Sequence, residues 1–164
     1  MPDYEAYLGL LTPRMIPFTT RWKNYKSKPL TSSAWKRTHY WSVPRKKNPK
    51  LVQKSIAKAI INHFPVVDHP ILHIHWLYPA GIAIPLLKEA GYKCVLMIHG
   101  SDWNKDYQNP TLFPIIETAI KASDAVLVSG PRLEETITNT LKLKNEIECI
   151  YNHIDTAHFP ATTE

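Results

Sequence analysis

Side chains that could take part in chemistry lie at the ends of two short apolar runs of the sequence. His73 and His75 end the first run, and His99 and Asp102 come directly after the second. Histidine and aspartate can stabilise charge in a reacting group or bind a metal ion. A His-x-His pair could begin the metal site of a hydrolase, but such a site needs further ligands, and only His99 and Asp102 are available. A metal-dependent hydrolase is therefore one alternative for the function.

The elements that must position these side chains alternate between strand and helix. Apolar runs predict strands over 71–77, 93–98, 125–128 and 146–151, and three-to-four spacing of apolar residues predicts helices over 51–64, 80–90, 112–122 and 132–143. Strands that are apolar throughout and separated by helices indicate a parallel sheet with helices on both faces. We therefore expect an α/β, Rossmann-like fold. Ligands bind at the carboxyl ends of such strands, where the histidines lie.

The chain changes character near residue 50. Residues 1–50 are predicted to form a basic, proline-rich irregular segment with one strand over 38–43, residues 51–160 the Rossmann-like core, and residues 161–164 a tail. The 164 residues, 44% of them hydrophobic, suit one globular domain. No run approaches the ~18 apolar residues of a transmembrane helix, so we expect a cytoplasmic protein.

The positive charge lies almost entirely in the first third of the chain. Residues 1–60 hold 13 Lys and Arg against two acidic residues, a net +11, whereas residues 61–164 hold seven against 12, a net −5. Basic residues interleaved with aromatic ones could contact phosphates, RNA or an anionic membrane at the inner face of the cell envelope. We predict membrane or acceptor contact for Arg45, Lys46, Lys47 and Lys50. The alternatives are a solvated surface segment and a nucleic-acid-binding module, although no recognised RNA or DNA motif accompanies the charge.

Four signatures, in order, resemble the N-terminal, acceptor-side domain of family-4-type glycosyltransferases, which have the GT-B fold. They are the strand end at 73–81 with its Pro and Gly, the His-Gly-Ser-Asp turn at 99–102, the strand ending in Val128-Ser129, and the junction Asn152-His153-Ile154-Asp155. The resemblance covers residues 38–160, and four signatures in the right order argue against coincidence. His153 departs from the family pattern, because it replaces a glycine, and a histidine adopts a left-handed conformation only at some cost. The resemblance implies that this chain is one half of a GT-B fold.

The resemblance also implies roles for individual residues. It implies that His99 and Asp102 are catalytic. It also implies that the substrate is bound by His75, Tyr78, Gly81, Gly100, Ser129, Asn152 and Asp155. Each assignment has a structural alternative. His99 could be bonded only to a neighbouring loop, and His75 could be packed beneath a helix. Gly81 could allow tight helix packing instead of leaving free N–H groups for an anion. Ser129 could cap the next helix.

The implied reaction needs no cofactor and no metal, because the nucleotide-sugar donor is a substrate and the family transfers its sugar with retention of configuration. Members with similar signatures build bacterial surface polysaccharides or glycolipids on lipid-linked or saccharide acceptors. The family's opening strand, glycine-rich turn and helix are not recognised here, and its donor-binding domain would begin after Pro160. We therefore expect a domain truncated at both ends, inactive alone, that is completed by a C-terminal domain, a complementing chain or a second copy.

Overall fold

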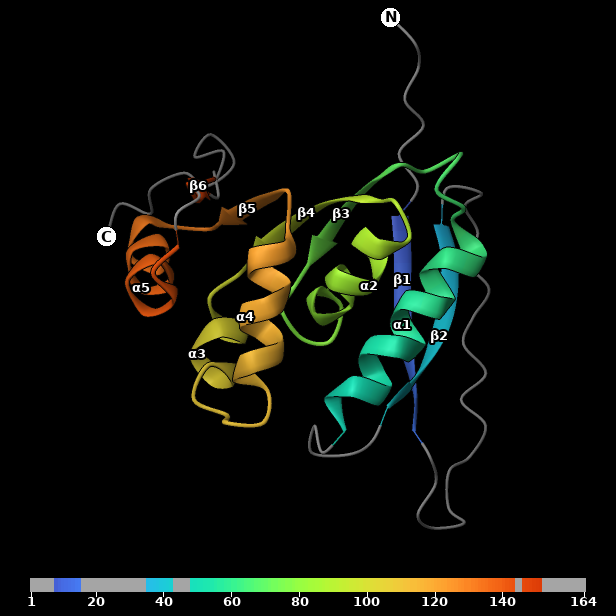
Figure 1. Cartoon of the computed structure of the whole chain (residues 1–164), viewed down its shortest axis with the longest axis horizontal. Coiled ribbons are helices and arrows are strands. Elements are labelled where there is room, and N and C mark those ends of the chain that lie inside the picture. The colour runs from blue at the N-terminus through green and yellow to red at the C-terminus, as the bar shows by residue number, and fades with distance from the viewer. Residues whose placement is uncertain (1–7, 16–34, 43–47, 144–145, 152–164) are drawn as a thin grey trace, which may run out of the picture.

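The computed structural model describes residues 8–15, 35–42, 48–143 and 146–151. The elements along the chain, shown in Figure 1, are β1 (Leu8–Met15), β2 (Trp35–Ser42), α1 (Pro49–His63), β3 (Ile71–His75), the 3-10 helix η2 (Gly81–Ala83), α2 (Ile84–Glu89), β4 (Lys93–Ile98), α3 (Ser101–Asp106), α4 (Phe113–Ala122), β5 (Ala125–Val128), α5 (Pro131–Leu141) and β6 (Glu148–Cys149).

The strands form two parallel sheets. A four-stranded sheet has the order β3-β4-β5-β6, and a two-stranded sheet pairs β1 with β2. Helices connect successive strands of the larger sheet, as parallel neighbours require. The predicted α/β, Rossmann-like arrangement is confirmed, and it places the ends of β3, β4 and β5 on one edge of the sheet.

Helix α1 joins the smaller sheet to the larger one. It begins where the side chain of Asn48 accepts a hydrogen bond from the Leu51 N–H at 3.1 Å, with Pro49 in the first turn. Its apolar residues recur on one face, which packs against β2, η2 and α2. Figure 1 shows α1, α2 and α4 side by side in front of the strands. Tyr40 of β2 is buried in the same core, and this burial raises the pKa of its phenol to about 12.

Burial differs between the strands of the larger sheet. Leu96, Met97 and Ile98 of β4 are all buried, so the carboxyl-terminal half of this strand is covered on both faces. In β3, Ile74 is buried, but His73 and His75 on the other face are exposed. Because successive side chains point to opposite faces of a strand, one face of β3 is open at the edge where ligands bind in such folds.

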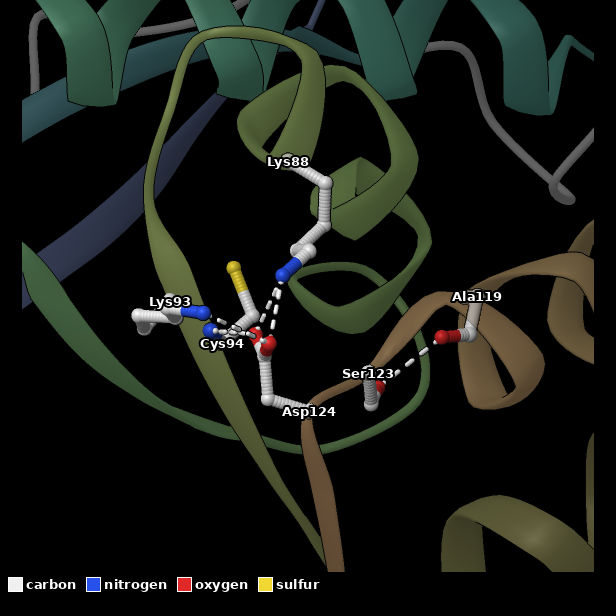
Figure 2. A network of polar contacts seen from close by, with 6 residues as sticks. All are labelled: Lys88, Lys93, Cys94, Ala119, Ser123 and Asp124. Carbon is white, nitrogen blue, oxygen red and sulfur yellow. Dashed lines mark hydrogen bonds and ion pairs between the residues drawn. The ribbon is translucent and has the colours of Figure 1, made fainter. Parts of the chain in front are cut away.

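A polar network centred on Asp124 lies at the amino-terminal edge of the sheet (Figure 2). Lys88 Nζ lies 2.6 Å from both carboxylate oxygens of Asp124, and the Cys94 N–H donates to Oδ2 at 2.7 Å. The hydrogen bond from Lys88 is the largest cause of a lowered pKa at Asp124, followed by the bond from the Cys94 N–H. This network ties the start of β5 to β4 and α2, far from the histidines at the opposite strand ends.

Two elements contradict the sequence predictions. Residues 8–15 form a strand, β1, in a segment predicted to be irregular outside 38–43. Pro13 is one of the prolines that indicated an irregular segment, but β1 pairs only with β2 among the described strands, and proline is tolerated in such an edge strand. Helix α3 was also not predicted, because Trp103 is its one large apolar residue. That side chain is fully buried and fixes the helix through tertiary packing.

Three predicted elements are shorter than expected. The strand expected over 71–77 ends at His75, the helix expected over 80–90 is divided into η2 and α2, and the strand expected over 146–151 is reduced to Glu148–Cys149. The first of these changes matters for the site. Trp76 has a backbone φ of 75°, so the extended conformation of β3 ends at this residue.

Candidate functional site

His75 and His99 meet at the carboxyl ends of β3 and β4. The parallel register pairs His75 with Met97, and His99 directly follows β4, so the two side chains come from adjacent strand ends. His75 Nδ1 lies 2.9 Å from His99 Nε2. The ring centroids are 5.1 Å apart and the ring planes differ by 18°, so the two rings lie nearly parallel. The structure thus brings together two of the histidines singled out by the sequence.

Two further rings extend this pair. The His73 ring centroid is 4.5 Å from that of His75, and the Trp76 centroid is 4.7 Å from that of His99. We call His73, His75, His99 and Trp76 the ring cluster. His73, His75 and Trp76 are exposed, and His99 is partly exposed. The alternative in which His75 is packed beneath a helix is therefore wrong, and the ring cluster is accessible to a ligand.

The hydrogen bond between the histidines limits their protonation. A bond between two imidazole nitrogens uses one proton, so His75 Nδ1 and His99 Nε2 cannot both carry a hydrogen. Burial, followed by the neighbouring His73 and His99, lowers the pKa of His75, which favours its neutral form. Because His99 uses Nε2 for this bond, Nδ1 is its nitrogen left for a ligand.

Trp76 was not predicted as a site residue, and its position depends on Gly81. Its left-handed backbone is unfavourable for a residue other than glycine, and two hydrogen bonds hold it. The Trp76 N–H donates to the Met97 carbonyl at 3.0 Å, and the Trp76 carbonyl accepts from the Gly81 N–H at 2.9 Å. A Cβ at Gly81 would lie 2.8 Å from that carbonyl oxygen and 3.0 Å from Leu96 Cδ1. The structure favours the packing alternative for Gly81, since its N–H is already used.

Asp102 connects the two loops that carry the ring cluster. It is 5% exposed, and its Oδ2 accepts from the Leu77 N–H at 2.8 Å while its Oδ1 accepts from the His99 N–H at 3.2 Å. Both carboxylate oxygens therefore bind backbone groups, one in the loop after β3 and one at the end of β4. The geometry supports a positioning role for Asp102, and direct participation in catalysis stays a prediction.

Gly100 and Ser129 lie at the same edge. Gly100 has a φ of 89° and accepts from the Asn104 N–H at 2.9 Å, so its left-handed conformation begins α3 directly after His99. Ser129 follows β5, whose last residue pairs in register with the last residue of β4. The N-cap of α5 is Gly130, without a side-chain hydrogen bond, so the capping alternative for Ser129 is wrong. Ser129 thus remains a predicted ligand contact close to His99.

The other predicted residues are less informative. Tyr78 is partly buried against the core and precedes a cis peptide bond to Pro79. Lys50 is exposed in the first turn of α1. The remaining predicted contacts, and the residue that departs from the family junction, lie outside the described residues; they are Arg45, Lys46, Lys47, Asn152, His153 and Asp155.

Neither a metal site nor a membrane-spanning helix is found among the described residues. No group of three or more His, Cys, Asp or Glu side chains is placed there to hold a metal ion, so the metal-hydrolase alternative gains no support. None of the helices in this part of the chain has the length and apolar character needed to cross a bilayer.

Comparison with known proteins identifies the family of the chain. The family model described as Glycosyltransferase Family 4 matches residues 18–158. The chain is also 31% identical over 88 residues to the N-acetyl-alpha-D-glucosaminyl L-malate synthase of Bacillus anthracis. That alignment covers 52% of this chain and 23% of the relative, so the chain matches about a quarter of the relative's length. The family match spans most of the chain, including all four of the signatures quoted above. The chain therefore belongs to glycosyltransferase family 4.

Proposed function

We propose that this chain is the acceptor-side part of a retaining glycosyltransferase that uses a nucleotide-sugar donor and no cofactor. The proposal is carried by the hydrogen bond between His75 Nδ1 and His99 Nε2 at 2.9 Å. This bond fixes His99 at the strand ends of a Rossmann-like sheet, where ligands of such folds bind. Membership of glycosyltransferase family 4 supports the reaction class.

In the proposed reaction, the bond between the anomeric carbon of the sugar and the diphosphate breaks, and the diphosphate leaves with the electron pair. A new bond forms from the anomeric carbon to an acceptor hydroxyl, whose proton passes to the departing diphosphate. His99 offers Nδ1 to the sugar or to the group that develops charge, because its Nε2 is held by His75. Asp102 keeps the backbone of His99 in place through the bond from the His99 N–H. Gly100 leaves room for a ligand close to the backbone.

The acceptor can be identified by a screen of candidate compounds, and its identity would indicate the biological role. We propose synthesis of bacterial surface polysaccharide or glycolipid, with a lipid-linked or saccharide acceptor, and a donor-binding domain or complementing chain as partner. The name of the relative combines an N-acetyl-α-D-glucosaminyl group with L-malate. A screen should therefore include L-malate beside the saccharide and lipid-linked acceptors.

Binding is the first test. In NMR titrations of the chain, the saccharide or lipid-linked acceptor, or L-malate, should shift the imidazole signals of His75 and His99 and the indole signal of Trp76. His63, in the last turn of α1, is the internal control and should not shift. If no candidate ligand moves the ring cluster, the proposed site is wrong.

Transfer is the second test, carried out with a donor-binding domain supplied as a second polypeptide. We expect His99→Ala to lower the rate by ~10² or more if the imidazole stabilises charge in the transition state. Lys142→Gln, an exposed change at the end of α5, is the matched control and should retain activity. Wild-type kinetics for His99→Ala, in a variant that unfolds at the same temperature, would leave His99 with only a structural role.

A further inference from the structure

The outward face of α1 carries a stripe of positive charge. Lys50, Lys54 and Lys58 recur at every fourth residue, and all three side chains are exposed. Residues four apart lie on one side of a helix. The helix contains no acidic residue, and none of the three lysines forms an ion pair within the part of the chain that the structure describes. Among the described residues, no acidic side chain pairs with this stripe.

An exposed apolar side chain accompanies the lysines. Ile61 comes three residues after Lys58 and seven after Lys54, so it lies on the same side of α1, and it is 39% exposed. We call Lys50, Lys54, Lys58 and Ile61 the α1 face.

Packing fixes the direction in which this face points. The opposite side of α1 is apolar and buried against β2, η2 and α2, with Val52 and Ile56 almost fully inaccessible to solvent. Rotation of the helix would expose these side chains to water and is unfavourable. The three lysines are therefore presented together toward any surface that the α1 face meets.

We propose that the α1 face docks on an anionic lipid bilayer. Exposed lysines without acidic partners among the described residues are complementary to negatively charged headgroups, and the isoleucine beside them can enter the interfacial region. A nucleic acid would use the lysines, but it gives no role to the aliphatic Ile61. Helix α1 follows Arg45, Lys46 and Lys47 in sequence, so the α1 face extends that predicted contact onto a helix. The proposal does not depend on sugar transfer, because docking needs no donor or acceptor.

Vesicle co-sedimentation of the full chain tests the proposal. Wild-type protein should bind vesicles of phosphatidylcholine with one-third phosphatidylglycerol and should not bind vesicles of phosphatidylcholine alone. Each lysine near an anionic surface strengthens binding about fivefold, so the double variant Lys54→Gln with Lys58→Gln should bind at least about tenfold more weakly. Ile61→Ser should weaken the binding that persists in high salt, where charge attraction is screened.

The matched control removes the same charge elsewhere. Lys105 and Lys142 are exposed and lie outside α1, so Lys105→Gln with Lys142→Gln should change vesicle binding little. An equal loss in both double variants would show that net charge alone acts, and the proposal would fail. It would also fail if the wild-type chain bound single-stranded RNA through Lys54 and Lys58 but did not bind the anionic vesicles. Thermal unfolding of each variant establishes that the comparison is made between folded proteins.

Discussion

His75 Nδ1 and His99 Nε2 are 2.9 Å apart, although the two residues are 24 positions apart in the sequence. The contact exists because β3 and β4 are parallel neighbours in register, so both strands end at the same edge. The hydrogen bond links the two strand ends through side chains, and Asp102 links the following loops through backbone N–H groups. His99 is thus held at both its side chain and its backbone.

We expect the pKa of His75 to lie below its ordinary value of 6.5, because burial and the neighbouring His73 and His99 disfavour its charged form. Since the folded protein disfavours protonation of His75, its contribution to stability is complete above pH 6.5 and is lost as the pH falls through the pKa of the folded state. NMR titration of the imidazole signals measures this pKa. It should rise toward 6.5 in His99→Ala, and a wild-type value at or above 6.5 would contradict the prediction.

Asp102→Ala should lower the free energy of unfolding by about 1–3 kcal/mol, because it leaves the Leu77 N–H buried without its acceptor and also removes the acceptor of the His99 N–H. Urea unfolding measures the change, and the His99 imidazole signal should move at the same time. Glu135→Gln replaces an exposed carboxylate on α5 and serves as the control. Unchanged stability in Asp102→Ala would show that the two loops do not depend on this carboxylate.

Gly81→Ala should destabilise the fold by about 1–3 kcal/mol, since its Cβ would lie 2.8 Å from the Trp76 carbonyl oxygen. The indole signal of Trp76 should shift, because this carbonyl holds the turn that carries the ring. Gly130→Ala is the matched control, as a Cβ there meets nothing within 4 Å. Its cost should not exceed about 1 kcal/mol, the preference for glycine over alanine at an N-cap. Equal costs and equal shifts in the two variants would argue against the close approach at Gly81.

Asp124→Ala should reduce stability at neutral pH by about 1 kcal/mol, a modest value because the carboxylate is partly exposed. The lowered pKa of Asp124 means that its stabilisation is present above the ordinary value of 3.8 and is lost as the pH falls through the folded-state value. The variant should therefore lose less stability than the wild type between pH 5 and pH 2 in urea unfolding. Parallel pH profiles for the two proteins would mean that the network in Figure 2 does not contribute to acid sensitivity.

The sequence alone determined the fold class and the edge of the sheet at which the site lies. The strands at 93–98 and 125–128 were predicted with the bounds that the structure has, because uninterrupted apolar runs of this length between helices become buried strands. Parallel order then placed His75 and His99 at one edge. The spacing of apolar residues also identified α1, since a helix that packs on a core must repeat with the period of its turns.

Tertiary structure decided how these residues are used. The exposed side chain of His75 follows from the lack of cover on one face of β3, which depends on where distant helices pack. Other features depend on contacts between segments that are separated along the chain. They are the bond from the Leu77 N–H to Asp102, the close approach of Gly81 to the Trp76 carbonyl, and the burial of Trp103 in the core. Residue types and local periodicity specify which side chains can be buried or bonded, but the partner of each group is set by non-local packing.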